Sequence, residues 1–282
     1  MTYKKNKNEQ TKANSSRHEI KPKKEFWKSR QFIFGVIAAV IIVVIVVIAI
    51  TNPFFAAPAS ISGEKYYKVA DHDLLSNGST AVYFISWYGC PIGATDSWAL
   101  YYAMNSTTDI YSHVAYHQAY NRDIYANAAG TAGQPGLLFK GVFNFQNHGK
   151  TVTFYPLYMY NQTMTGTVNN GKINESLASY GLSLINSTFP SAVAKMFNKY
   201  ASDITFKGHL TTSFIITGPH GAYIFNSFMY DGGILGTGTW SEYTDQNTYS
   251  PFSPQSVMSG LSSDSTIISA AHSFENNLTA VE

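Results

Sequence analysis

The chain has 282 residues, of which 45% are hydrophobic and 13% are charged, and its formal net charge is +2. These values exclude a long disordered polyelectrolyte and a collagen-like composition, and the length is sufficient to bury at least one core. The single cysteine excludes an internal disulfide framework and a zinc site with four cysteine ligands.

The charges are unevenly distributed along the chain. Residues 1–30 hold ten Lys/Arg and three Asp/Glu, which leaves nine basic and fourteen acidic residues for the remainder. A basic segment with so little to bury is typical of a disordered tail. We therefore predict a basic cytoplasmic tail over residues 1–30 that contacts anionic membrane lipid and no nucleic acid.

An apolar segment follows the tail. The run from Phe32 to Ile50 contains no charged residue, and a helix of this length spans about 28 Å, close to the hydrocarbon core of a bilayer at about 30 Å. Because the run is apolar all round, it does not read as an amphipathic helix packed on a core. We predict one transmembrane helix over residues 31–51.

The flanking charges give the orientation of this helix. Basic residues crowd its N-terminal side, whereas only Lys65 and Lys68 lie within about twenty residues after it. The positive-inside rule then predicts a single-pass cell-membrane protein with a cytoplasmic N-terminus and an extracellular C-terminal domain. The rival interpretation is a cleaved signal peptide ending near Ala57-Pro58-Ala59, for which the apolar and basic segments are long.

Potential N-glycosylation sites agree with export. Six Asn-x-Ser/Thr motifs lie beyond the apolar segment, and each alone is a weak signal in a chain rich in Ser, Thr and Asn. Their number predicts a glycoprotein surface. The six asparagines are Asn77, Asn105, Asn161, Asn174, Asn186 and Asn277.

Residues 52–80 read as a linker and domain entry, and residues 81–282 as the exported domain. The apolar run from Ala81 to Trp87 predicts a buried strand, and Ala94 to Met104 a helix. Residues 105–150 are rich in Gly, Asn and Tyr and are predicted to be an irregular insertion. A second strand is expected from Val152 to Tyr160, at an edge or a bulge because it contains Pro156.

The rest of the domain predicts two helices, a hairpin and a final helix. Apolar residues repeat at helical spacing from Ile173 to Leu184 and from Val193 to Tyr200. The segments Thr211–Thr217 and Ala222–Met229 flank a Gly-Pro-His-Gly turn. A Gly-rich loop over residues 231–239 and a helix from Ile267 to Leu278, capped by Ser263 or Asp264, complete the chain. We predict an α/β fold with a thioredoxin-like order of elements and a helical insertion.

One cysteine carries the chemical signal. The sequence Trp87-x-x-Cys90-Pro91 between a strand and a helix resembles the active-site turn of thioredoxin-like proteins. Cys90 is predicted at the helix N-cap with Pro91 at the first helical position, where unpaired amides and the helix dipole lower a thiol pKa. Trp87 and Tyr88 oppose this effect by desolvation, so we predict a modest depression of the Cys90 pKa. Gly93 occupies the place of a second cysteine, which leaves a monothiol.

A loop facing the thiol is the second element of this resemblance. Thioredoxin-like proteins place a cis-proline there, and two segments compete for the position. Pro135 lies 45 residues after Cys90, whereas Thr212 lies 122 residues after it and leads directly into the hairpin. We predict that Thr212 faces Cys90.

The body from about residue 65 onward also resembles an archaeal family known as domain of unknown function 929. The similarity is strongest over Phe84–Trp98 and extends to Pro135–Phe139 and Pro156–Asn161. The resemblance implies a thioredoxin-like fold and membrane-anchored relatives in thermoacidophilic archaea, and it implies no activity.

Two functions remain open, and the chain is not assigned as an enzyme. In the first, the Cys90 thiolate attacks a peroxide or the disulfide of a disulfide-bearing protein, and an external thiol resolves the product. In the second, the domain is a non-catalytic cell-surface module that binds an unidentified ligand. No cofactor and no metal are predicted: His113 and His117, spaced for one helical face, and the Asp71-His72-Asp73 turn are interpreted as solvated side chains.

Overall fold

The computed structural model describes residues 30–51, 56–117, 135–232 and 254–282. The chain divides into two compact units, Met1–Phe54 and Phe55–Glu282. In the first unit the described element is helix α1 (Arg30–Thr51), which coincides with the predicted apolar helix. Across the described residues, no helix meets the combined length and hydrophobicity that crossing a membrane requires. The predicted tail lies outside the described residues up to position 29.

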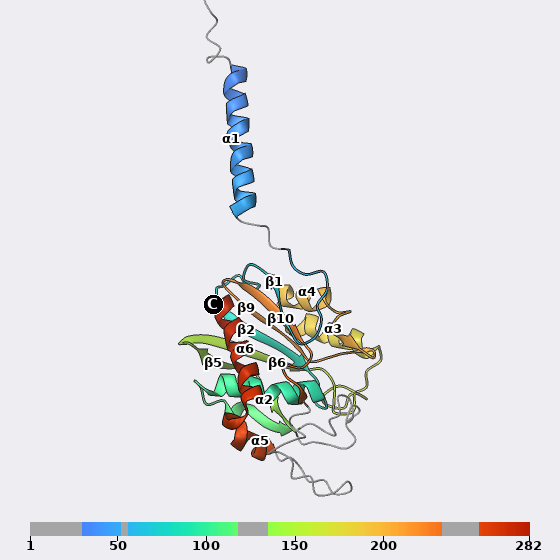
Figure 1. The fold of residues 1–282 in the computed structure, drawn as a ribbon. Coiled ribbons are helices and arrows are strands. Elements are labelled where there is room, and N and C mark those ends of the chain that lie inside the picture. Colours follow the sequence, from blue (N-terminus) through green and yellow to red (C-terminus); the bar gives the residue numbers. More distant parts are fainter. Residues whose placement is uncertain (1–29, 52–55, 118–134, 233–253) are drawn as a thin grey trace, which may run out of the picture. The chain divides into compact units, whose positions relative to one another are not determined.

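The second unit is built on a six-stranded mixed sheet (Figure 1). The spatial order of its strands is β1-β10-β9-β2-β6-β5, so strands far apart in sequence are neighbours. Only β2 and β6 run parallel, and every other neighbouring pair is antiparallel. The strands are β1 (Tyr66–Ala70), β2 (Thr80–Ser86), β5 (Phe143–Asn147), β6 (Lys150–Tyr158), β9 (Ser213–Gly218) and β10 (Gly221–Asn226).

Strand β2 lies inside the sheet and is buried on both faces, as its nearly continuous apolar sequence predicts. Its side chains alternate between two hydrophobic clusters. Val82 and Phe84 belong to one cluster, and Tyr83 and Ile85 to the other. The sheet therefore separates two cores.

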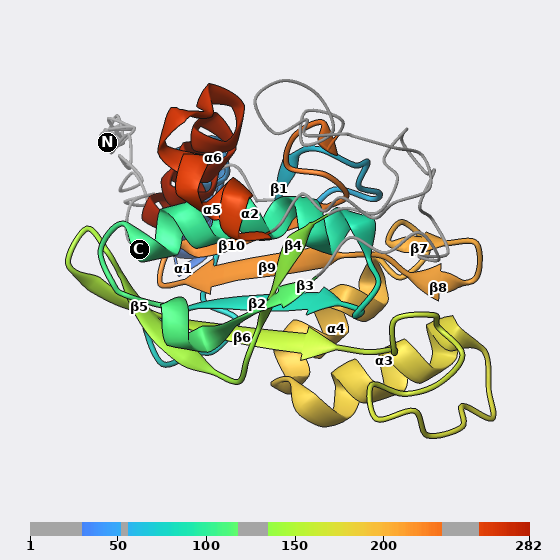
Figure 2. The ribbon, with the colours of Figure 1, turned by 90° about the horizontal axis from the view of Figure 1, so that it is seen from below.

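Helices cover both faces of the sheet, which makes a three-layer α/β/α unit (Figure 2). One face carries α2 (Pro91–Asn105), α5 (Pro254–Gly260) and α6 (Ser265–Val281). The other carries α3 (Leu177–Thr188) and α4 (Ser191–Lys199).

Several short elements complete the described part. Two small antiparallel pairs lie outside the main sheet, and a 3-10 turn precedes each of β3 and α6. The pairs are β3 (Val114–His117) with β4 (Gly136–Phe139) and β7 (Thr205–Phe206) with β8 (His209–Leu210); the 3-10 turns are η2 (Tyr111–His113) and η6 (Leu261–Ser263).

Local signals in the sequence agree with these elements where side chains cap or turn the chain. Asp264 Oδ1 accepts hydrogen bonds from the amides of Thr266 and Ile267, so Asp264 is the N-cap of α6. The predicted hairpin is β9 with β10. The predicted Gly-rich loop is described only at Asp231 and Gly232.

Two predicted loop regions contain strands. The linker over 52–80 holds β1, which pairs with β10 at the edge of the sheet, and the insertion over 105–150 holds β3, β4 and β5. These strands have four or five residues each, too few for a clear hydrophobic period. The predicted edge position of Pro156 holds only locally: β6 lies between β2 and β5, but its pairing with β5 ends at Phe154, two residues before Pro156.

Candidate functional site

Cys90 lies at the start of α2, directly after the turn that leaves β2. Its backbone is extended, with φ −74° and ψ 115°, and its carbonyl oxygen accepts from the amide of Ala94 at 2.9 Å. Pro91 is the first helical residue, where its missing amide costs no hydrogen bond. The predicted N-cap position of Cys90 is confirmed.

Polar groups from two strands surround the sulfur. Thr212 Oγ1 donates to Cys90 Sγ at 3.0 Å, and Ser86 Oγ lies 2.8 Å from Thr212 Oγ1. Since the Thr212 hydroxyl proton points to sulfur, Ser86 is the donor to Thr212. Ser86 ends β2 and Thr212 immediately precedes β9, so the antiparallel pairing of these strands brings both hydroxyls to α2. The predicted proximity of Thr212 and Cys90 is confirmed.

Pro135, the competing residue for this position, lies elsewhere. Its carbonyl oxygen accepts from Trp98 Nε1 at 2.9 Å, beside the middle of α2. Because the indole of Trp98 is fully buried, this hydrogen bond satisfies a donor that water does not reach.

Burial raises the pKa of the Cys90 thiol. The hydroxyl of Thr212 and the backbone amides of Gly93 and Ile92 act in the opposite direction, but desolvation outweighs them. The predicted depression of the pKa is therefore wrong. The helix N-terminus contributes as expected, yet only 3% of the residue is exposed, and the charged form loses more hydration than the helix end returns.

Gly93 fits closely against the two hydroxyls. A Cβ atom at this position would lie 2.9 Å from Thr212 Oγ1 and closer still to Ser86 Oγ. Any residue with a side chain, including a second cysteine, would have to displace these buried groups. The monothiol character of the turn thus follows from the packing beneath α2.

A pocket of about 330 Å³ opens beside the thiol. Cys90 and its neighbours Pro91 and Ile92 form one side of it. Much of its lining is apolar or aromatic, as is common in ligand sites. The other described lining residues come from the domain entry, the turn between α4 and β7, the β7–β8 hairpin and the ends of β2, β9 and β10. They are Gly63, Trp87, Asp203, Thr205, Phe206, His209, Thr211, Asn226, Ser227 and Phe228.

His209 and Asp203 are the lining residues with ordinary acid–base chemistry besides Cys90. The His209 ring lies edge-on to Trp87 and Phe206, with centroids 6.1 and 6.2 Å away, and burial lowers its pKa. Asp203 Oδ2 accepts from the amide of Ile61 at 2.8 Å. The sequence gives no signal for either residue, because both lie more than 110 positions from Cys90 and belong to no motif.

Asp96, also on α2, lies in a different environment. It is completely buried, and its Oδ1 accepts from the amide of Met229 at 2.8 Å. Within the described residues, Oδ2 has no hydrogen-bond partner, and the same is true of the hydroxyls of Tyr66 and Thr95. Desolvation holds the pKa of Asp96 well above its usual range, so this carboxyl keeps its proton to a higher pH than an exposed aspartate does.

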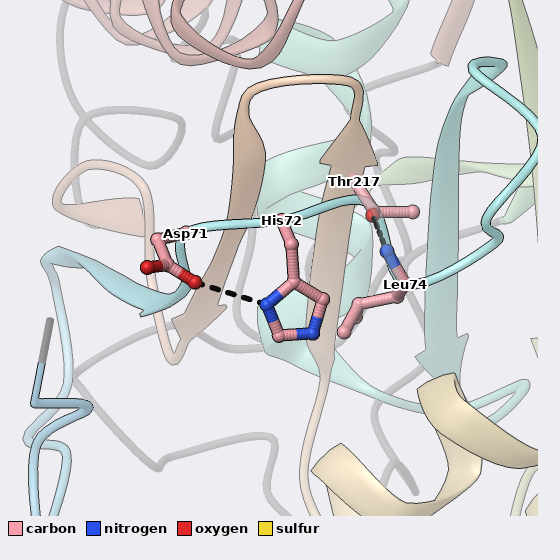
Figure 3. Close-up of polar contacts among 4 residues, drawn as sticks. All are labelled: Asp71, His72, Leu74 and Thr217. Atoms are coloured by element: carbon pink, nitrogen blue, oxygen red, sulfur yellow. Dashed lines mark hydrogen bonds and ion pairs between the residues drawn. The ribbon is translucent and has the colours of Figure 1, made fainter.

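The Asp71-His72-Asp73 segment, a further candidate from the sequence, makes local contacts. Figure 3 shows the exposed contact of His72 Nδ1 with Asp71 Oδ1 at 2.9 Å, beside the hydrogen bond from the Leu74 amide to Thr217 Oγ1 at 3.1 Å. Asp73 accepts three amides of its own loop, which makes it a turn residue.

The two insertion histidines do not share a helical face. His113 ends a 3-10 turn and stacks on Phe143, and His117 ends β3. Within the described ranges, no three His, Cys, Asp or Glu residues form a cluster able to hold a metal.

The family model named Domain of unknown function (DUF929) matches residues 65–280, which include Cys90, Thr212 and the pocket residues other than Gly63. No curated protein and no solved structure matches the chain.

Proposed function

The chain belongs to the DUF929 family, and we propose that it is a membrane-anchored, extracytoplasmic binding module in which the pocket beside Cys90 holds a ligand without thiol chemistry. One observation carries the proposal: the sulfur borders the pocket, but it is buried and its pKa is raised, although the hydroxyl of Thr212 donates to it. A reactive thiolate needs a hydrated sulfur and a lowered pKa.

A thioredoxin-like fold belongs to this proposal. The support is the order β2, α2, β6, two helices, β9, β10, α6, with β2 between a parallel β6 and an antiparallel β9. The turn after β2 then bears Cys90, and the loop before β9 faces it, as in the resemblance drawn from the sequence. Strands β1 and β5 extend the sheet at both edges, and Thr212 replaces the expected proline.

The membrane anchor rests on the first unit. Helix α1 follows a basic segment, and its described side chains from Ile33 to Val44 are apolar and mostly exposed. Apolar side chains on the surface of a helix favour an apolar surrounding. Protease added to intact cells is expected to digest the body and to spare the tail; digestion of the tail alone would contradict this topology.

If the domain is exported, the exposure of each motif asparagine predicts whether it carries a glycan. Asn77, Asn174 and Asn186 are exposed, whereas Asn161 is buried and its Nδ2 donates to Asn170 Oδ1 at 3.0 Å. We expect glycans on at least two of the exposed asparagines and none on Asn161. Mass spectrometry of native protein with every asparagine unmodified, or with a glycan on Asn161, would contradict this expectation.

An acidic exterior is a further part of the proposal. The protonated form of the fully buried Asp96 is the form that the folded domain accommodates, because an ionised carboxylate there would have one oxygen without a partner among the described residues. A domain exposed to low pH keeps this group neutral.

Titration with an uncharged probe tests the binding function. We expect 2-phenylethanol to bind the detergent-solubilised full chain, detected by saturation-transfer NMR. Ile92 borders the pocket, so Ile92→Trp should fill it and abolish binding, whereas Ile173→Trp, at a half-buried position that is not among the lining residues, should not. Absence of binding, or equal binding to both variants, would overturn the proposal.

Monothiol redox chemistry is the second candidate. The N-cap position of Cys90 and the amides of Ile92 and Gly93 favour it, because they lower the thiol pKa. Reaction with the aromatic disulfide DTNB separates the two candidates. The binding module predicts slower reaction in the folded than in the urea-unfolded chain, and a redox thiol predicts faster reaction in the folded chain.

A further inference from the structure

The pocket carries one formally charged side chain. Among the described residues that line it, Asp203 is the only Asp, Glu, Lys or Arg. The amide of Ile61 donates to its Oδ2 at 2.8 Å and fixes the carboxylate at the pocket. The Ser202 hydroxyl donates to Asp203 Oδ1 at 3.5 Å. A carboxylate has about four acceptor positions, so these two contacts leave capacity for a ligand donor.

Aromatic rings supply the rest of the recognition surface. Trp87, Phe206 and Phe228 line the pocket, and the ring of His209 lies edge-on between the first two. Lys207 Nζ lies 5.2 Å from the centroid of Phe206, so this ring already accepts a cation in the folded chain. Rings that border a carboxylate attract cations, because the negative face of the ring and the carboxylate act together.

The neighbouring basic side chains, His209 and Lys207, offset the negative charge of Asp203 in the pocket only slightly. Burial lowers the pKa of His209, so the imidazole is neutral at neutral pH and does not cancel Asp203. Lys207 is near but does not line the pocket. Its positive charge weakens the attraction for a cation from outside, which gives a second residue for the test.

We infer that the pocket takes a compact aromatic or apolar group that carries a protonated amine, an inference that rests on the proposed binding function. The volume of about 330 Å³ suits a group the size of a phenylethyl amine. Charge discrimination arises because an anion would place two negative charges together in a partly desolvated pocket.

Three probes that share a 2-phenylethyl group and differ in charge test the inference at pH 7 with the detergent-solubilised full chain. They are 2-phenylethylammonium, 2-phenylethanol and 3-phenylpropionate, and dissociation constants are measured by NMR titration. We expect the cation to bind most tightly, the alcohol less tightly and the anion most weakly.

Two substitutions move the cation affinity in opposite directions. Asp203→Asn keeps an oxygen for the Ile61 amide and removes the charge, and it should weaken cation binding about two- to fivefold, the range of a partly exposed ion pair, with the alcohol unaffected. Lys207→Gln should strengthen cation binding by a smaller factor. Asp71→Asn, which removes an exposed carboxylate that does not line the pocket, should change neither constant.

The outcomes separate the inference from the function beneath it. Equal affinity for all three probes, tighter binding of the anion, or an unchanged cation constant in Asp203→Asn would overturn the ligand class and leave the binding module in place. Failure of all three probes to bind would overturn both.

Discussion

Helix α2 holds two buried ionisable groups in contrasting surroundings, Cys90 at its N-terminal end and Asp96 further along. The sulfur accepts a hydrogen bond from the Thr212 hydroxyl at 3.0 Å, and nearby backbone amides lower its pKa. It also borders the pocket. The carboxyl accepts one amide, and its second oxygen has no partner in the described part of the chain.

Burial determines the direction of the pKa shift of both groups, although their polar neighbours differ. Donors around Cys90 lower its pKa, yet desolvation raises it further, and around Asp96 a single donor opposes a larger desolvation. A helix N-terminus therefore does not produce a thiolate without hydration. The hydrogen-bond donors around each group instead determine how much folding free energy its burial costs.

The largest expected effect concerns Asp96 and pH. Its pKa is raised in the folded state, so its contribution to stability is complete below the unfolded value near 3.9 and is lost as pH rises through the folded value. Within that window Asp96 should cost about 1.4 kcal/mol of unfolding free energy per pH unit. Urea unfolding from pH 3 to 8 should show that Asp96→Asn is less sensitive to rising pH than the unmodified chain.

A matched control distinguishes Asp96 from carboxylates in general. Glu175 is exposed, so Glu175→Gln should keep the pH profile of the unmodified chain. Parallel profiles for the Asp96→Asn variant and the unmodified chain would show that Asp96 titrates normally. The claim that burial raises the pKa of Asp96 would then be wrong.

The next effect concerns the close packing at Gly93. Gly93→Ala should destabilise the domain by about 1–3 kcal/mol, because the added methyl meets the buried hydroxyls of Ser86 and Thr212. Removing one hydroxyl in the double variant with Ser86→Ala should recover part of the loss. A double-mutant cycle by urea unfolding measures this coupling, and strict additivity would contradict the packing argument.

The smallest effect is expected at Thr212. Thr212→Val removes the hydroxyl that donates to Cys90 Sγ and keeps the shape, so the thiol pKa should rise by about one pH unit. The pH midpoint of alkylation by iodoacetamide reports this change. Thr279→Val serves as control, because the Thr279 hydroxyl donates to the Glu275 carbonyl oxygen and Thr279 does not line the pocket. Equal midpoints in the two variants would show that the Thr212 contact does not influence the thiol.

Local patterns predicted the parts of the fold that periodicity and capping specify. The apolar run of β2, the turn between β9 and β10, and Asp264 as the cap of α6 all carry strong short-range signals. Strand β1 was missed because it lies among turn residues and gains its stability from β10, more than 150 positions later. Such pairing leaves no local trace.

The candidate site divides in the same way. Cys90 and Pro91 are recognisable from the helix start, and Thr212 from its place before the hairpin. Asp203 and His209 enter the pocket only through the tertiary fold, and the direction of the Cys90 pKa depends on burial that the sequence does not report. The sequence indicates that Gly93 stands in place of a second cysteine. The structure shows that the buried hydroxyls of Ser86 and Thr212 leave no space for a side chain at this position.

The pH dependence of Cys90 alkylation in the folded, detergent-solubilised chain tests the central claim most directly. The chain has one cysteine, so the rate reports a single thiol, and Cys90→Ser provides the blank. We predict a midpoint above the free-thiol value of about 8.5 and a slower reaction than in the urea-unfolded chain. A midpoint below that value, with faster reaction in the folded chain, would contradict the binding module and favour a redox thiol.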